Sequence, residues 1–173
     1  TFLREIVGDQ YNEQLDAIIR NASKLKDIIE NLSNVDNYES GAARVRQRKV
    51  SITRVIDDVV ASFSDMAKQK GVNIKTDIGR NADLVEADGS KIAIALSNLV
   101  KNAITFTDTG GNILIKTQPV PGYVQVSVLD DGLGIPDKDQ PHIFERFFQV
   151  ESHLTRRHGG MGLGLSVAKA MIE

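Results

Sequence analysis

The sequence has no cysteine among its 173 residues, which excludes a disulfide scaffold and a thiolate metal site and fits a reducing cytoplasm. It also lacks an apolar run of the roughly 20 residues that a membrane helix needs, and it shows no signal peptide. Because the chain begins at Thr1 without a methionine, we expect it to be part of a longer protein. We therefore expect a cytoplasmic domain, with any membrane attachment confined to segments upstream of Thr1.

A strong charge of either sign is also missing. The formal net charge of −2 gives no overall attraction to nucleic acid or to a membrane surface. Basic residues do alternate in Arg44-Val-Arg46-Gln-Arg48-Lys49, which fits either the outward face of an edge strand or a nucleic-acid patch. Too few basic residues surround this segment for such a patch, so we predict an edge strand and no nucleic-acid partner.

The first region of the chain, residues 1–43, is predicted to be helical. Thr1 to Val7 reads as the end of one helix and Gly8-Asp9-Gln10 as the turn to the next. In the second helix, apolar residues recur in steps of three and four, and three more widen this seam, which favours a helix in a bundle over a two-stranded coil. The seam consists of Leu15, Ile18, Ala22, Leu25, Ile29 and Leu32, widened by Ile19, Ile28 and Val35.

The second region, residues 44–173, changes to mixed strand and helix. Pro119 to Gly122 is predicted as a hairpin turn, and residues 135–160 as a long polar connection with a short helix around Phe144. Helices on one face of a mixed sheet make an α+β fold, here a two-layer α/β sandwich. The predicted strands are 49–52, 72–77, 84–87, 112–117 and 123–129, and the predicted helices 55–70, 89–106 and 162–172.

The stretch Gly159-Gly160-Met161-Gly162-Leu163-Gly164-Leu165 leads directly into the last predicted helix. Alternating glycines let the backbone approach an anion closely, and the free N–H groups of a helix start point at it. A triphosphate would suit this place, although a flexible loop has the same composition. The stretch is not a Walker loop, because no Gly-Lys-Ser/Thr follows, and it lies too far from the first strand to be a Rossmann turn.

Two further motifs carry polar side chains in apolar surroundings. Asp130-Asp131-Gly132-Leu133-Gly134-Ile135 ends an apolar strand, where a carboxylate can accept a hydrogen bond from the amino group of a base; an ordinary Asp-Gly turn looks the same. Asn98 and Asn102 share one face of an apolar helix, and burying two amides is costly without partners. Mg²⁺, which takes oxygen ligands and bridges phosphates, would supply one; neighbouring backbone is the alternative.

Taken in chain order, the asparagine pair, the Asp130 motif and the glycine stretch resemble the N, G1 and G2 boxes of sensor histidine kinases, in that order and at that spacing. These kinases belong to the gyrase–Hsp90–histidine kinase–MutL ATPase superfamily. Ile143 to Phe148 is similar to the F box of that family. Residues 1–43 resemble part of its dimerisation and phosphotransfer hairpin, and residues 44–173 its catalytic ATP-binding domain. The resemblance implies an ATP-dependent protein-histidine kinase of a two-component system, a homodimer through the hairpin, with a response-regulator receiver domain as its partner.

The resemblance also implies roles for individual residues. Asn102 would bind Mg²⁺ beside Asn98 and the phosphates, and Asp130 would bind the adenine amino group. Residues 136–160 would form the ATP lid, and Arg146 would either approach the γ-phosphate or form a structural salt bridge. The other residues expected to contact ATP are Lys101, Phe106, Gly132, Gly134, Ile135, Gly160, Gly162, Leu163, Gly164 and Leu165.

The chain departs from the family pattern in three places. Thr105 stands where the family usually has a lysine, and we expect Lys101, one helical turn earlier, to replace it in part. None of the three histidines, His142, His153 and His158, stands in a phosphoacceptor pattern, so the acceptor is expected upstream of Thr1. The chain also ends before the strands that usually close the family's sheet.

Asn98 decides between two chemistries of the superfamily. It occupies the position of the superfamily's water-activating glutamate, and an amide cannot abstract a proton, so phosphoryl transfer is favoured over ATP hydrolysis. A nucleotide-binding but catalytically silent signalling module is the alternative. The helical first region and the F box argue against a third possibility, an anti-sigma-type serine kinase.

Overall fold

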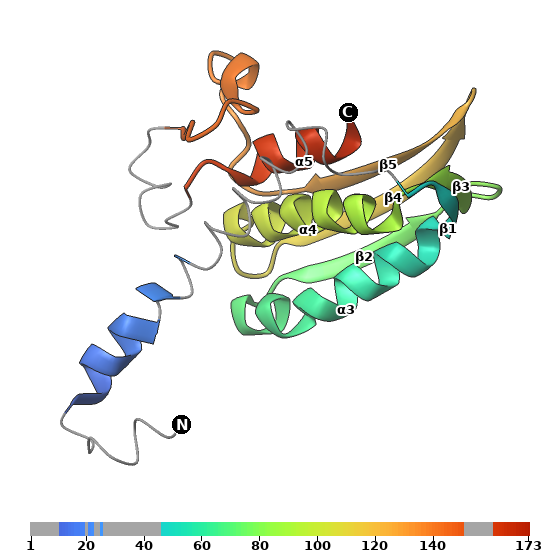
Figure 1. Ribbon diagram of the computed structural model, residues 1–173. Coiled ribbons are helices and arrows are strands. Elements are labelled where there is room, and N and C mark those ends of the chain that lie inside the picture. Colours follow the sequence, from blue (N-terminus) through green and yellow to red (C-terminus); the bar gives the residue numbers. More distant parts are fainter. Residues whose placement is uncertain (1–10, 20, 23–24, 26–45, 151–160) are drawn as a thin grey trace.

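The computed structural model describes residues 11–19, 21–22, 25, 46–150 and 161–173 (Figure 1). Helices α3, α4 and α5 lie together on one face of the main sheet, which confirms the predicted two-layer α+β sandwich. From residue 48 onward the elements are β1 (Arg48–Ser51), α3 (Ile52–Lys70), β2 (Asn73–Ile78), β3 (Leu84–Ala87), α4 (Gly89–Phe106), β4 (Asn112–Val120), β5 (Tyr123–Asp130), the 3₁₀ helix η2 (Gln140–His142) and α5 (Gly164–Ile172).

The main sheet is mixed, with its three strands in the order β2-β4-β5. β2 runs parallel to β4, whereas β5 runs antiparallel to it and brings Asp130 opposite Ile113. β1 and β3 form a separate antiparallel pair. Arg48 and Lys49 of β1 are exposed, as the alternating basic residues predict for an edge strand.

The core lies between the sheet and the helices. Its centre consists of branched aliphatic side chains that are 1% exposed or less: Ile56 from α3, Val100 and Ile104 from α4, and Ile113 and Ile115 from β4. A second cluster of mostly small side chains joins α4 to α5, which run antiparallel to each other (Figure 1). It contains Ala95, Val167, Ala168 and Met171.

Helix α4 begins where Asp88 caps it. The Asp88 Oδ1 atom accepts hydrogen bonds from the backbone N–H groups of Ser90 at 3.1 Å and Lys91 at 3.4 Å, and from the Ser90 hydroxyl. Its Oδ2 atom accepts one from the Arg46 N–H at 3.1 Å. These bonds, led by that of the Ser90 hydroxyl, lower the pKa of Asp88 to about 2. The cap fixes the start of the helix that carries both asparagines.

The β4–β5 hairpin has a shorter turn than predicted. β4 continues through Pro119 to Val120, which pairs with Tyr123, so the turn consists of Pro121 and Gly122 alone. The prediction was wrong because a proline usually interrupts a strand. Here it is tolerated, since β2 pairs with β4 only as far as Thr117 and leaves that edge of the strand open.

Two predicted helix positions are also corrected. The short helix expected around Phe144 is a 3₁₀ turn at Gln140–His142, which ends just before it. The last helix starts at Gly164 and not at Gly162, because Gly162 has a left-handed backbone with φ of +68° that no right-handed helix contains.

The first region is helical wherever it is described beyond Tyr11, at residues 12–19, 21–22 and 25. Leu15 of the seam is buried, whereas Ile18 and Leu25 are 63% and 59% exposed. The later seam residues and the boundary predicted at residues 43 and 44 lie outside the described residues, so the division into two domains stays a prediction. No helix in the described parts of the chain is long and apolar enough to cross a membrane.

Candidate functional site

Asn98 and Asn102 stand on the side of α4 that faces the start of α5. The Asn98 Nδ2 group donates a hydrogen bond to the Ile94 carbonyl, one helical turn earlier, at 3.0 Å. The Asn98 Oδ1 atom lies 3.1 Å, and the Asn102 Oδ1 atom 3.7 Å, from the point where a Cβ atom on Gly164 would lie. The structure therefore brings together two side-chain amides from one helix and the first residue of another, 62 positions after Asn102 in the chain.

The start of α5 can contact a ligand mainly through its backbone. The first N–H groups of a helix have no partner within the helix, so they are available to an anion. Leu163 is only 4% exposed, and its carbonyl accepts hydrogen bonds from the Ser166 hydroxyl and the Val167 N–H, both at 2.9 Å. Leu165 is half-buried. The lack of a side chain at Gly164 keeps the space beside the two asparagines open.

Two adjacent carboxylates at the end of β5 have different surroundings. Asp131 accepts hydrogen bonds from the Asn112 N–H at 2.8 Å and from the Asn112 Nδ2 group at 3.0 Å, and these bonds lower its pKa. Asp130 is exposed, and its Oδ1 atom accepts a hydrogen bond from the Gly132 N–H at 3.0 Å. Asp131 thus joins β5 to β4, whereas Asp130 presents its carboxylate at the loop.

The loop after Asp130 is attached to the end of α4. The Leu133 N–H donates a hydrogen bond to the Phe106 carbonyl at 3.2 Å. Position 132 requires glycine, because a Cβ atom there would lie 2.5 Å from the same carbonyl oxygen. Phe106 itself is half-buried. The predicted base-binding loop is therefore held by the same helix that carries the asparagines.

Gly134 and Ile135 lead the chain out of this loop. Gly134 has a left-handed backbone with φ of +66°, which glycine adopts without steric cost. Ile135 is 41% exposed, and its carbonyl accepts a hydrogen bond from the Gln140 Nε2 group at 3.2 Å. An exposed apolar side chain, five residues after Asp130 in the chain, offers a surface on which a flat ring can pack.

The F-box segment is fastened to the residues before α5. The Phe147 N–H donates a hydrogen bond to the Gly162 carbonyl at 2.8 Å. A Cβ atom on Gly162 would lie 2.6 Å from the Phe147 carbonyl carbon, so only glycine fits. Phe147 has a φ of +64°, which is unusual for a residue with a side chain. We call this pair of left-handed residues the Phe147–Gly162 clasp; the sequence carries no signal for it.

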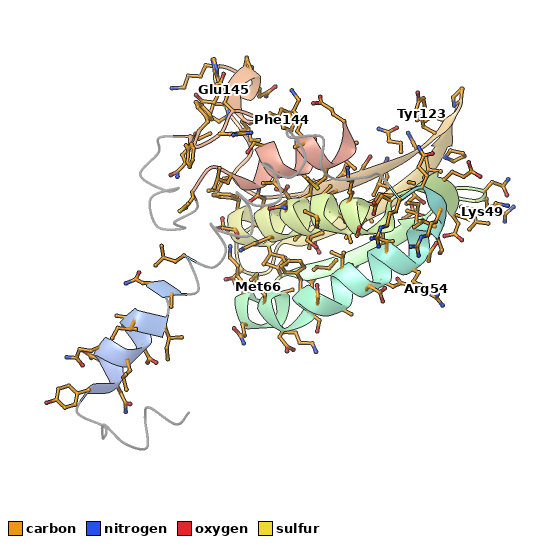
Figure 2. All side chains as sticks on the ribbon, in the orientation of Figure 1. Lys49, Arg54, Met66, Tyr123, Phe144 and Glu145 are labelled. Atoms are coloured by element: carbon orange, nitrogen blue, oxygen red, sulfur yellow. The ribbon has the colours of Figure 1, made fainter. Side chains whose placement is uncertain are left out.

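Side chains of the F box make further contacts; two of them, Phe144 and Glu145, are labelled in Figure 2. His142 Nδ1 and Glu145 Oε1 are 2.7 Å apart, and the centres of the His142 and Phe148 rings are 5.5 Å apart. The Lys169 ammonium of α5 lies 5.9 Å from the centre of the Phe144 ring, a cation–π contact. The segment therefore has a backbone connection to Gly162, just before α5, and a side-chain connection to Lys169 within α5.

The contacts described above do not place Arg146 or Lys101 at this site. Arg146 is exposed in the F box, and Lys101 is exposed on α4 beside the asparagine face. The Thr105 hydroxyl donates to the Lys101 carbonyl at 2.7 Å. The roles of Arg146 and Lys101 stay predictions. Gly160 lies outside the described residues, as do His153, His158 and most of the predicted lid.

Comparison with known proteins gives a family match over the part of the chain that contains this site. The family described as "Histidine kinase-, DNA gyrase B-, and HSP90-like ATPase" matches residues 87–173. Hybrid signal transduction histidine kinase D of Dictyostelium discoideum is 31% identical over 174 residues, which cover 97% of this chain and 11% of that protein. Signal transduction histidine-protein kinase BarA of Escherichia coli K12 is 31% identical over 93% of this chain and 18% of its own length.

Solved structures have the same fold. Full-length ShkA in complex with AMPPNP matches 95% of this chain and 34% of that chain, with a TM-score of 0.79 and 23% identity. Histidine kinase ThkA in complex with the response regulator protein TrrA matches 98% of this chain and 47% of that chain, with a TM-score of 0.73 and 25% identity. This chain spans about a tenth to a quarter of the length of the curated relatives it matches.

The family match covers the asparagines of α4, the Asp130 loop, the F box and the start of α5, which are the elements that the fold brings together. Both curated relatives named above, which align with almost the whole of this chain, are histidine kinases. The chain therefore belongs to the histidine kinase-, DNA gyrase B- and HSP90-like ATPase family, as the catalytic ATP-binding domain of a sensor histidine kinase.

Proposed function

We propose that this chain binds Mg-ATP between α4, the start of α5 and the Asp130 loop, and transfers the γ-phosphoryl group to a histidine on a helical hairpin. A single observation carries the proposal: the side-chain oxygens of Asn98 and Asn102 lie beside Gly164, the residue without a side chain at the N-terminus of α5. This arrangement pairs amide oxygens, which suit a hard cation, with backbone N–H groups, which suit phosphate oxygens. The AMPPNP bound to the related ShkA supports a nucleotide as the ligand.

The residues present fit a magnesium ion that is held largely by the nucleotide. Among the residues that the structure describes, no group of three or more histidine, cysteine, aspartate or glutamate side chains could hold a metal. Mg²⁺ characteristically uses one or two protein ligands together with phosphate oxygens and water. Asn102, with Asn98 beside it, would provide the protein contribution, and the bound ion would neutralise phosphate charge during transfer.

Asp130 would select adenine by accepting a hydrogen bond from its amino group. The carboxylate is exposed at the loop, whereas its neighbour Asp131 is engaged with Asn112. Gly132, Gly134 and Ile135 would line the base, and Phe106 would border it from the end of α4. Gly160, Gly162, Leu163, Gly164 and Leu165 would contact the phosphates, chiefly through their backbone.

Transfer to histidine fits this site better than hydrolysis of ATP. Asn98 is an amide and cannot act as the base that activates water, so catalysis rests on positioning and on neutralising phosphate charge. The exposed apolar residues Ile18 and Leu25 of the first region fit a homodimer formed through a hairpin. The TrrA bound to the related ThkA supports a response regulator as the partner that receives the phosphoryl group.

The test joins the chain to a hairpin that carries an acceptor histidine and supplies Mg²⁺ and ATP labelled at the γ-phosphate. We expect a protein-bound label that is lost in acid and retained in base, as for phosphohistidine. Asn102→Ala should abolish the label, while the control Asn73→Ala, at an exposed position on β2, should keep it. An acid-stable label would disprove transfer to histidine. ATP binding without any label would favour the catalytically silent signalling module.

A further inference from the structure

Helix α4 ends without a positive charge of its own, and a lysine from another helix supplies one. The last turn of α4 contains no basic residue. Lys70, the last residue of α3, donates from its ammonium group to the Ile104 carbonyl at 2.7 Å and also to the Thr105 carbonyl. The last carbonyls of a helix have no partner within it and carry the negative end of its dipole. Lys70 therefore satisfies two of them with one cation, from 34 and 35 residues away in sequence.

The next carbonyl along this helix end holds the base-binding loop. After Ile104 and Thr105, the Phe106 carbonyl accepts the hydrogen bond of the Leu133 N–H and packs against Gly132. The three consecutive carbonyls are thus shared between a half-buried cation and the loop that begins at Asp130. A change in the direction of the first two carbonyls alters the direction of the third, because all belong to one turn of helix.

The surroundings of Lys70 hold its ammonium group in one place. Its side chain is half-buried, and burial lowers its pKa, against the opposing attraction of Asp108 in the turn after α4. A cation is withdrawn from water in this way only where the protein provides close partners. Lys68 lies two residues before Lys70 in the same last turn of α3. It is exposed, so it serves as a control for the loss of a lysine at this helix end.

We infer that Lys70 is a positioning residue for adenine recognition: by fixing the C-terminal end of α4 it sets the place of the Gly132–Leu133 backbone, and with it the Asp130 carboxylate. This inference rests on the proposed nucleotide site and adds a residue that does not touch the nucleotide. Loss of Lys70 loosens the adenine end of the site and leaves the phosphate end, at Asn98 and Gly164, in place.

The experiment compares the wild-type chain with Lys70→Met, Lys70→Arg and the matched control Lys68→Met. Dissociation constants are measured for Mg-ATP and for Mg-inosine triphosphate, which has a carbonyl oxygen in place of the amino group. For Lys70→Met we expect ATP to bind about tenfold more weakly and inosine triphosphate less than about twofold more weakly, because one charge-assisted contact is lost at the adenine end. Lys70→Arg restores most of the preference, and Lys68→Met retains all of it.

Hydrogen exchange of the Leu133 amide gives a second readout, which needs no nucleotide. It becomes faster in Lys70→Met at a temperature where that variant is folded, and it is unchanged in Lys68→Met. An equal loss of affinity for both nucleotides, or an unchanged Leu133 amide, would show that Lys70 contributes only to stability. If the wild-type chain binds neither nucleotide, the proposed function fails, and the Leu133 amide still decides whether Lys70 fixes the loop. If Lys70→Met does not fold, Lys70→Gln is measured in the same two ways.

Discussion

The substitution Gly164→Ala separates the stability of this domain from its ability to bind nucleotide. Alanine is favoured over glycine within a helix by about 1 kcal/mol. The added methyl group would lie 3.1 Å from the Asn98 Oδ1 atom, a tight contact that offsets part of this gain. We therefore expect the free energy of unfolding to change by less than about 1 kcal/mol. The same methyl group fills the space between the asparagines and the first N–H groups of α5.

Nucleotide binding should respond far more strongly than stability to this substitution. An Mg-phosphate group excluded from this place loses the charge-assisted hydrogen bonds from the N–H groups of the helix start and the contact of the cation with the amide oxygens. A loss of about 2–3 kcal/mol corresponds to a rise of roughly 30- to 150-fold in the dissociation constant. The measurements are calorimetric titration with Mg-ATP and a thermal unfolding curve on the same sample.

Gly89→Ala provides the matched control, because Gly89 is also the first residue of a helix. A Cβ atom there would lie 3.3 Å from two methyl groups of Val50, far along α4 from the asparagines. We expect ATP affinity to stay within a factor of about two of the wild-type value. Wild-type affinity in Gly164→Ala, or an equal loss in both variants, would refute the assignment of the phosphate site to the start of α5.

Three further outcomes follow from the geometry. Asp130→Asn should weaken ATP binding and leave the melting temperature unchanged, whereas Asp131→Asn should lower the melting temperature and leave ATP affinity unchanged. Nucleotide titration and thermal unfolding of both variants test this, and the opposite pattern would show that the two aspartates exchange these roles. Because the folded pKa of Asp88, about 2, lies below its ordinary value of 3.8, its cap stabilises fully above that value and is lost as the pH falls toward 2. Asp88→Ala should therefore cost about 1 kcal/mol at neutral pH, and denaturant titrations should show this difference vanishing in acid. Phe147→Gly should be more stable than Phe147→Ala by about 1 kcal/mol, since only glycine adopts a positive φ without strain; equal midpoints of unfolding would contradict this.

Local patterns in the sequence were sufficient to predict the central helix. Asp88 before an apolar run, and the loss of that run after Phe106, predict the bounds of α4 as the structure has them. Strand ends were harder to predict, because they depend on pairing between distant segments. Whether β4 continues through Pro119 is decided by where β2 stops, and β2 lies some forty residues earlier.

The candidate site divides in the same way between local and distant causes. The spacing of the motifs indicates Asp130, Asn98 and Asn102, because each stands in a short recognisable pattern. It does not reveal that Asp131 joins two strands, since that role requires Asn112 opposite it in the folded sheet. Phe147 and Lys70 escape sequence analysis for the same reason: each is defined by a partner at least fifteen residues away in the chain.

Helix α4 connects the parts of the site, and each part is fixed by a different contact. One face of α4 packs Val100 and Ile104 into the main core, so the helix cannot turn about its axis without breaking that core. A second face packs Ala95 against α5, which holds the N-terminus of α5 beside Asn98. The C-terminal end carries the base-binding loop.

These three attachments make the proposed phosphate end and the proposed adenine end of the site structurally separate. The phosphate end depends on how α5 packs against α4, and α5 is in turn connected to the F box by the Phe147–Gly162 clasp. The adenine end depends on the turn of α4 that Lys70 holds. Under the proposed function, a shift of α5 with the F box would therefore alter the contacts of the γ-phosphate while the base stays bound. Such a division would suit a domain that keeps its nucleotide while phosphoryl transfer is switched on and off.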